Sequence, residues 1–336
     1  MSMKQVSILY FLFSQVLFVY GQNIKTIHID ADNARSLNLS EIAENVTPFI
    51  LERSLGGIQN IFLTNEYLFI ASVNSVVQCD LSGKFIREID CGVLITHNVT
   101  GDILKRELYV PVKDKIKCYD FFGNYKREYS LSTSSLYCLY HKGNLWVQSY
   151  QSPPDRSSIN MINKISLSTG EIIILPFEVK YDPVQIEKGL LLGIGAICNL
   201  SLYNDEAVVS FDRENTLYTI QQDKVTPFVH WSISPPAQSN DIFPMSAHGF
   251  IGEYLFINYR RSGLYYIYLE NLKTGKKHNV NNLVDNIFQT NGNCNIKSMS
   301  QEGYFYFQKE RRDIKGNSIG NIPLKNGPVL FIVKIK

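Results

Sequence analysis

The chain has 336 residues, of which 45% are hydrophobic and 12% aromatic, so it can bury a large core. Its 33 basic and 31 acidic side chains leave a formal net charge of +2. So small a net charge gives no reason to expect nucleic acid or an anionic membrane as the main partner. The 20 Tyr and 19 Phe, against 2 Trp and 5 Met, favour strands.

The first residues have the pattern of a secretory signal peptide. Lys4 precedes an apolar stretch over residues 6–19, and Val19-Tyr20-Gly21 offers small residues where a signal peptidase cleaves. The apolar stretch is shorter than the roughly twenty residues needed to span a bilayer, so we expect no transmembrane anchor. We predict a signal peptide over residues 1–21, a mature chain that starts near Gln22, and export to the periplasm, the cell surface or the medium. No Cys stands at the expected cleavage site, so we expect no lipid anchor there.

Residues 59–89 contain four strand-like segments within one unit. Residues 67–71 form an unbroken apolar run, which is typical of a strand covered on both faces. Residues 76–79 predict the next strand. The turn Asp80-Leu81-Ser82-Gly83 follows, since Gly accepts a positive φ and Asp bonds nearby backbone amides. Residues 84–89 then predict a more polar fourth strand.

The same order of strands and turns recurs at a spacing of roughly 40 to 55 residues. Residues 107–129, 144–175 and 254–276 repeat it with a Gly in the last turn. The copy at residues 206–220 has Gln222-Asp223-Lys224 in place of that turn. Four short strands per unit at this period are typical of the blades of a β-propeller.

The sequence accommodates six such units, which predicts an all-β fold: a six-bladed β-propeller of four-stranded antiparallel blades. We assign residues 22–336 to this one domain. The sixth unit has strands at 303–308 and 329–335 but no chain left for an outer strand. Closing the ring would take that strand from the N-terminus, from residues 25–30 or 46–51, which removes free sheet edges. A β-sandwich or two stacked all-β domains is the alternative, but it gives no reason for turns to recur in register.

The six cysteines could form disulfides in an exported chain. Their positions argue against a disulfide framework, because Cys79 and Cys118 fall in corresponding strands of the first two units. Cys138 and Cys198 likewise fall in the first strands of the next two. There is no CxxC motif. Buried free Cys is a common small apolar filler, so we predict structural thiols.

The order of these pieces resembles the six-bladed β-propeller proteins of Bacteroidetes, which are related in architecture to the NHL-repeat propellers. The resemblance is carried by the exported N-terminus, residues 39–52 (LSEIAENVTPFILE), the GIQNI strand at residues 57–61 and residues 68–89. It covers most of the chain from about residue 25 onward. It implies the propeller fold and a binding role outside the cytoplasm, but it implies no reaction.

The motifs that would indicate catalysis or a cofactor are absent or broken. Gly193-Ile194-Gly195 begins like a dinucleotide fingerprint, but Cys198 replaces the third Gly and no helix pattern follows. Residues 30–41 have the spacing of a calcium loop, but Arg35 stands where that loop needs Gly. No His pair has zinc-ligand spacing, and there is no GxSxG elbow or P-loop. We therefore expect no cofactor and assign no catalytic residues.

A metal-dependent hydrolase of the lactonase or esterase kind is the alternative function, because some six-bladed propellers hydrolyse esters or lactones with a metal at the ring axis. The expected inner strands offer these side chains to such an ion: Asn60, Asn98, Asn199, His248 and Asn295. All are neutral, whereas Ca²⁺ usually takes carboxylates as well, and Asp102 is the one carboxylate in an expected inner strand. We assign no metal ligands. The third possible class of function is a structural role within an assembly of the cell envelope.

Connection lengths predict which face of the disc binds a partner. In a four-stranded meander the chain reverses at each turn, so the link between the second and third strands and the link to the next blade lie on the same face. The long connections all belong to this set: residues 151–158, 178–196, 232–244, 281–292 and 309–328. Long ordered loops on a rigid scaffold are where binding residues concentrate, so we expect the site on this face.

Arg and aromatic side chains lie in or beside these connections. Arg can donate paired hydrogen bonds to an anion, and an aromatic ring can stack on a sugar. The predicted ligand-binding residues are Tyr150, Arg156, Trp231, His248, Arg260, Arg261, Arg311 and Arg312, and Tyr181 and Phe243 lie in the same set of loops. We expect a monomeric binding module for an unknown small molecule, peptide or glycan, or for a protein partner. The alternative is that these loops are solvated and carry no site.

Overall fold

The protein is described by a computed structural model over residues 24–336, with gaps. The residues left out within that range are 54, 56, 73–74, 93–97, 155–156, 182–198, 212–213, 235–247, 262–263, 321 and 325–326. The predicted signal peptide, residues 1–21, lies outside the described residues. Over the part that is described, no helix combines the length and the apolar character needed to cross a membrane.

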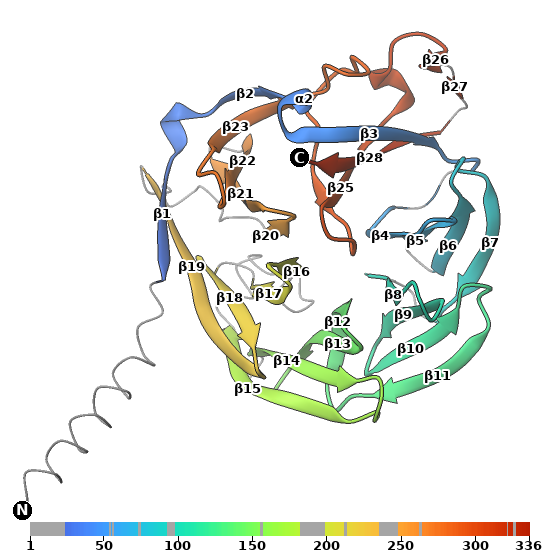
Figure 1. Ribbon diagram of the computed structural model, residues 1–336, viewed down its shortest axis with the longest axis vertical. Helices are drawn as coiled ribbons and strands as arrows, with labels where there is room; N and C mark the ends of the chain where they lie inside the picture. Colours follow the sequence, from blue (N-terminus) through green and yellow to red (C-terminus); the bar gives the residue numbers. More distant parts are fainter. Residues whose placement is uncertain are drawn as a thin grey trace, which may run out of the picture.

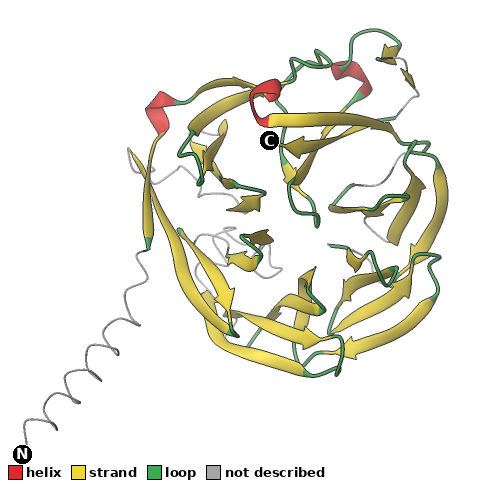
Figure 2. Ribbon diagram, viewed as in Figure 1, coloured by secondary structure: helices red, strands yellow, loops and turns green. Residues whose placement is uncertain are grey.

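Six sheets surround a central axis, each with the first strand of its repeat unit innermost (Figure 1). The predicted six-bladed β-propeller is therefore confirmed. Helix is limited to short turns in the described residues, such as α2 (Leu39–Ile42) and the 3₁₀ turns Ala31–Asn33 and Arg311–Asp313 (Figure 2).

The first three blades are four-stranded antiparallel meanders whose strands follow the chain from the axis outward. Blade one consists of β4 (Asn60–Leu63), β5 (Tyr67–Ala71), β6 (Ser75–Asp80) and β7 (Phe85–Asp90); blade two of β8 (Thr100–Asp102), β9 (Glu107–Val112), β10 (Lys115–Asp120) and β11 (Tyr125–Ser130); blade three of β12 (Ser134–His141), β13 (Asn144–Gln151), β14 (Ser158–Ser166) and β15 (Ile172–Tyr181).

Blades four and five each gain a fifth, outermost strand from the N-terminal segment. Their own strands are β16 (Asn199–Tyr203), β17 (Glu206–Ser210), β18 (Thr216–Gln221) and β19 (Lys224–Ser234) in blade four, and β20 (His248–Ile251), β21 (Tyr254–Arg261), β22 (Leu264–Asn271) and β23 (Lys277–Val284) in blade five. β1 (Lys25–Asp30) runs parallel to β19, and β2 (Arg35–Asn38) runs parallel to β23.

Blade six is completed by an N-terminal strand, as the sequence predicts. Its strands are β24 (Lys297–Ser298), β25 (Tyr304–Lys309), β28 (Val329–Ile335) and β3 (Ala43–Ile50), and a small hairpin of β26 (Ser318–Ile319) and β27 (Ile322–Pro323) lies between β25 and β28. β28 pairs with β3 in antiparallel register, with Phe331 opposite Pro48 and Val333 opposite Val46. Of the two predicted closing segments, the one at residues 46–51 therefore closes the ring, and the one at residues 25–30 extends blade four.

Hydrophobic side chains fill the interfaces between neighbouring blades. Leu68 and Ile70 of β5 pack in a cluster with Leu330 of blade six. Phe69, between them in sequence, packs against Phe121 of blade two at 5.1 Å between ring centroids. Successive side chains of a strand point to opposite faces, so a strand covered on both faces is apolar throughout. The other blade interfaces are filled in the same way.

Gly83 joins the closing strand to blade one. It lies in the turn between β6 and β7 with a φ of +84°, a conformation that favours glycine. A Cβ atom here would lie 2.7 Å from the carbonyl oxygen of Ile50, the last residue of β3. The Glu52 N–H donates to the Gly83 carbonyl at 3.2 Å. The turn that the sequence marks by its Gly therefore also receives the end of the strand that closes the ring.

The five cysteines that the structure describes are buried free thiols: Cys79, Cys91, Cys118, Cys138 and Cys294. Burial raises the pKa of Cys79 and Cys91 to about 11 and that of Cys118 and Cys294 to about 12. Thiols with so high a pKa are poor nucleophiles at neutral pH. The predicted structural role is confirmed for these five, whereas Cys198 lies outside the described residues.

Candidate functional site

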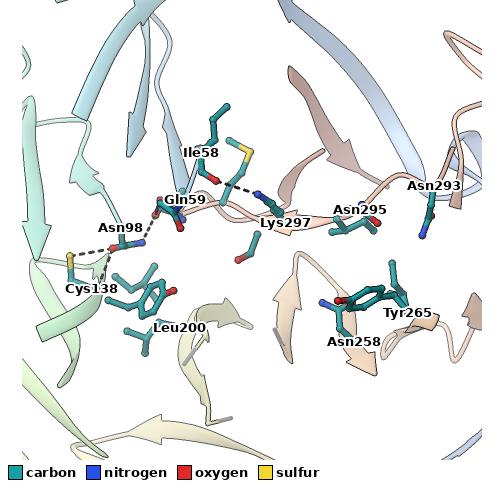
Figure 3. A pocket seen from close by; sticks show the side chains of 18 of the residues that line it. Ile58, Gln59, Asn98, Cys138, Leu200, Asn258, Tyr265, Asn293, Asn295 and Lys297 are labelled. Atoms are coloured by element: carbon teal, nitrogen blue, oxygen red, sulfur yellow. Dashed lines mark hydrogen bonds between the residues drawn. The ribbon is translucent and has the colours of Figure 1, made fainter. Parts of the chain in front are cut away.

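A cavity of about 540 Å³ lies at the ring axis, and all six blades contribute to its wall (Figure 3). Small-molecule sites typically have volumes of about 300 to 1,000 Å³. The lining residues are Ile58, Gln59, Asn60, Asn98, Tyr137, Cys138, Leu139, Leu200, Asn258, Tyr265, Tyr266, Ile267, Asn293 and residues 295–300. The wall therefore combines amide, hydroxyl and apolar groups with the ammonium of Lys297.

The cavity lies on the side of the ring where the inner strands begin. Asn60 is the first residue of β4, Leu200 the second of β16, and Lys297 the first of β24. Tyr265 lies at the beginning of β22, a third strand. In an antiparallel meander, first and third strands both begin at the face that carries the blade-to-blade links and the links from second to third strands. This is the face to which the sequence assigns the long connections.

A chain of hydrogen bonds joins the inner ends of neighbouring blades beside the cavity. The Ser300 hydroxyl of blade six lies 2.8 Å from Asn60 Oδ1 of blade one. Asn98 Nδ2, next to blade two, donates to Ser300 Oγ at 3.3 Å. The backbone N–H of Cys138 in blade three donates to Asn98 Oδ1 at 3.1 Å (Figure 3). These two asparagines therefore connect successive blades through their side-chain oxygens.

This hydrogen bonding bears on the metal-dependent alternative. The Oδ1 atoms of Asn60 and Asn98, which an axial ion would need, already accept hydrogen bonds within the protein. Asp102 is buried at the far end of β8, where it accepts the Tyr140 hydroxyl at 2.7 Å and the Leu104 N–H at 2.9 Å. Within the described ranges, no group of three or more His, Cys, Asp or Glu side chains could hold a metal ion. The side-chain oxygens of Asn60, Asn98 and Asp102 therefore make hydrogen bonds within the fold.

Lys297 is the one charged side chain among the described residues that line the cavity. Its Nζ donates to the Ile58 carbonyl at 3.3 Å and lies 5.8 Å from the centre of the Tyr306 ring. The Lys297 side chain is exposed, yet desolvation by the surrounding protein lowers the pKa of Lys297. No carboxylate of the described chain pairs with this ammonium. Its position makes it the first candidate for holding a charged ligand.

Tyrosine rings form the side of the cavity opposite blade two. Tyr265 is 51% exposed, and its neighbour Tyr266 stacks on Tyr259 with 5.1 Å between ring centroids. A second hollow shares Tyr265 and Tyr266 with the cavity and continues to residues 281–282 of β23. The second hollow therefore lies beside the axial cavity, over blade five.

The segment that carries the lining residues Asn293 and Asn295 is held in place by Lys309. Lys309 is buried, and its Nζ donates to the carbonyl oxygens of Asn291, Gly292 and Asn293 at 2.7, 2.8 and 2.9 Å. All three N–H donors of this ammonium are therefore used. A wall that is fixed before a ligand arrives lowers the ordering cost of binding.

Among the described residues, none of the eight predicted ligand-binding side chains lines the cavity. Arg156 lies outside the described residues, as does Phe243. For His248, Arg260 and Tyr181 the structure describes only the backbone, in β20, β21 and β15. For these positions a binding role stays a prediction.

Trp231 is a core residue, which corrects the expectation that its ring lies beside the binding loops. Its side chain is 0% exposed and packs in the cluster between blades four and five, with Ile27 and Ile29 of β1. Ile27 is its register partner. The physical reason is the fifth strand, which covers β19 and leaves no face of the indole for a ligand.

Of the remaining predicted side chains, Arg261 contacts the N-terminal segment and Arg311 contacts its own loop. Arg261 pairs with Asp32 at 2.5 Å. Arg311 donates to two backbone carbonyls of its own loop at 2.6 and 3.1 Å. Arg312 is exposed in the same loop, and Tyr150 is partly buried near the end of β13. Their part in ligand binding stays a prediction.

Sequence reasoning missed Lys297 and Tyr265. A signal for Lys297 was present, because Asn295 is recognisable as the approach to an inner strand and Lys297 follows two positions later, on the same face of an extended chain. Tyr265 lies directly after the short link that follows Arg261. It could have been included with the aromatic residues of the same face.

No family model and no curated protein matches the sequence. The fold is similar to a Bacteroides fragilis protein named "Putative exported protein", with a TM-score of 0.66 and 15% identity over 93% of this chain and 100% of that one. It is also similar to a DUF4221 family member from Bacteroides vulgatus, with a TM-score of 0.53 and 12% identity over 88% and 98% of the two chains. A third is a protein of unknown function from Bacteroides thetaiotaomicron, with a TM-score of 0.54 and 10% identity over 89% and 74%. At these identities the likeness shows the propeller fold alone.

Proposed function

We propose that this protein is an exported, non-catalytic binding protein whose axial cavity holds a small soluble ligand. The observation that carries the proposal is the cavity itself, to which all six blades contribute. Its wall is braced by the buried Lys309 and by the hydrogen bonds of Ser300, Asn60 and Asn98. Rigid walls with a few convergent polar groups are typical of small-molecule sites.

The test is a screen of sugars, sugar acids, amino acids and short peptides by thermal shift, followed by calorimetry on the mature protein. We expect a bound ligand to raise the melting temperature, because it stabilises only the folded state. Asn295→Trp should weaken binding about tenfold or more, since the larger side chain fills the cavity. Leu104→Trp is the matched control, because Leu104 is 95% exposed in the turn between β8 and β9, on the opposite face.

Two outcomes count against this function. A ligand that binds Asn295→Trp as tightly as the parent does not occupy the cavity. A ligand that is converted on prolonged incubation favours the alternative, a lactonase-like or esterase-like hydrolase, and elemental analysis of the purified protein would then be needed to look for an axial ion. We also propose that the blades are of the NHL-like kind and that the protein is a monomer. Light scattering measures the oligomeric state.

Export is the second part of the proposal, and it rests on the apolar N-terminal stretch and on the exported name of the Bacteroides fragilis protein. We expect the mature protein to begin near Gln22 and to carry no lipid. Intact mass spectrometry of protein secreted by its native host measures both. A mass that includes Met1, or an added acyl mass, would contradict this prediction.

A further inference from the structure

We propose that the ligand of the axial cavity is a sugar acid, held by its single carboxylate on the Lys297 ammonium. The inference rests on the binding function proposed above and names the class of ligand. It follows from the hydrogen-bonding capacity of Lys297, the charges around it and the remaining groups of the wall.

Lys297 has donors to spare, which the comparison with Lys309 makes clear. The Lys309 ammonium donates to three backbone carbonyls, which accounts for all its N–H groups. Lys297 donates to the Ile58 carbonyl alone among the described residues, at 3.3 Å. Up to two N–H groups of Lys297 are therefore available to an acceptor in the cavity. Figure 3 shows the Lys297 side chain on the cavity wall, with its hydrogen bond to Ile58.

The charges around Lys297 favour a monoanion. Among the described residues of the wall there is no Asp or Glu, so the positive charge has no counter-ion there. The Lys297 ammonium can therefore attract the carboxylate of a ligand without competition from a carboxylate of the described wall. A doubly charged phosphate would leave a second negative charge facing neutral amides, since no other cation lines the described wall. One carboxylate therefore matches one lysine.

The rest of the wall suits a hydroxylated ring. Asn258 and Asn295 carry amides that both donate and accept, as sugar hydroxyls require. The Tyr265 ring is about half exposed and can cover the apolar face of a pyranose. A lipid acid or an aromatic acid would offer no ring of hydroxyls to these amides. The combination therefore points to a uronate or a related sugar acid, either free or at the end of an acidic glycan.

The experiment compares acids with their neutral counterparts by calorimetry on the full mature chain. The probes are D-glucuronate against D-glucose, D-galacturonate against D-galactose, and inorganic phosphate. We expect each uronate to bind at least about tenfold more tightly than its neutral partner and than phosphate. Trigalacturonate separates the two sources: tighter binding than the monomer indicates a glycan end, and weaker binding indicates a free sugar acid.

Variants then assign the effect to one side chain. Lys297→Met should remove the preference for the acid, whereas Lys297→Arg should keep most of it. Lys105→Met is the matched control, because Lys105 is exposed in the turn between β8 and β9. Melting curves establish that each variant is folded. If Lys297→Met does not fold, the salt dependence of the parent protein gives the same information, because added NaCl should weaken binding of the acid and not that of the neutral sugar.

The outcomes separate this inference from the proposed function. If neutral sugars bind as tightly as uronates and Asn295→Trp abolishes both, the cavity is the site but the carboxylate assignment is wrong. The assignment is also wrong if Lys297→Met keeps the preference for the acid, or if no uronate binds. If a uronate binds equally well to Asn295→Trp, the cavity is not its site and the proposed function fails as well.

Discussion

A chain that lacks residues 330–336 should fail to form a closed ring. These residues make up most of β28, which pairs with β25 on one side and β3 on the other. Without them both neighbours become free sheet edges, which template aggregation. Leu330, Phe331 and Val333 are fully buried. Losing a single large core side chain typically costs about 2 to 5 kcal/mol, against a total stability of roughly 5 to 15 kcal/mol.

Size-exclusion chromatography and thermal melting followed by circular dichroism measure the effect. The control is deletion of residues 24–30, which removes β1, a fifth strand outside a blade that already has four. That deletion should lower the melting temperature but leave the ring closed. Phe331→Ala should fall between the two, because Phe331 stacks on Phe307 at 4.8 Å between centroids. A monomeric chain without residues 330–336 that melts like the parent would show that this strand does not hold the ring.

The blades could be predicted from the sequence because their signals are local. The run YLFIA of β5 indicates a strand covered on both faces, and Leu68 and Phe69 do face different neighbouring blades. Gly83 marks its turn by its own backbone preference. The N-terminal segment was harder, since two stretches had strand patterns. In β1 every second residue from Ile27 is buried, as expected of a strand at the outer edge of a sheet. The burial pattern of a single strand does not indicate which blade the strand joins, and β1 joins blade four.

For the candidate site, the sequence indicated the face of the propeller on which the cavity lies but not the residues that line it. Connection lengths identify that face because the direction of each strand in a meander is fixed by the strand before it. The environment of a single side chain depends on segments far away in sequence. Arg261 is engaged by Asp32, 229 positions away, and Lys297 contacts Ile58, 239 positions away. No local pattern distinguishes an arginine with a partner from a lysine that faces a cavity.

Glu107→Gln should lower the stability of the protein at neutral pH and remove part of its sensitivity to acid. The Glu107 side chain is 4% exposed, and its carboxylate accepts from Arg127 at 2.7 Å, Lys126 at 2.5 Å and the Tyr109 hydroxyl at 2.7 Å. The hydrogen bond from Arg127 is the largest cause that lowers the pKa of Glu107, from 4.5 to about 2, against the opposing effect of burial. The folded protein therefore holds this carboxylate ionised far better than the unfolded chain does.

The sign of the pH dependence follows from that difference. Because the folded pKa lies below the unfolded one, the stabilisation is fully present above about pH 4.5 and is lost as the pH falls through about 2. A shift of this size corresponds to a stabilisation of about 3 kcal/mol. We expect roughly 2 kcal/mol after allowing for water around the cations, since the side chains of Lys126 and Arg127 are 41% and 37% exposed.

Urea unfolding at pH 7, 5 and 3 should show the largest difference in stability between the parent and Glu107→Gln at pH 7 and a smaller one at pH 3. Glu66→Gln is the control, because the pair of Glu66 with Arg106 is exposed and should matter little at any of these pH values. Equal midpoints for Glu107→Gln and the parent at pH 7 would show that this carboxylate does not stabilise blade two.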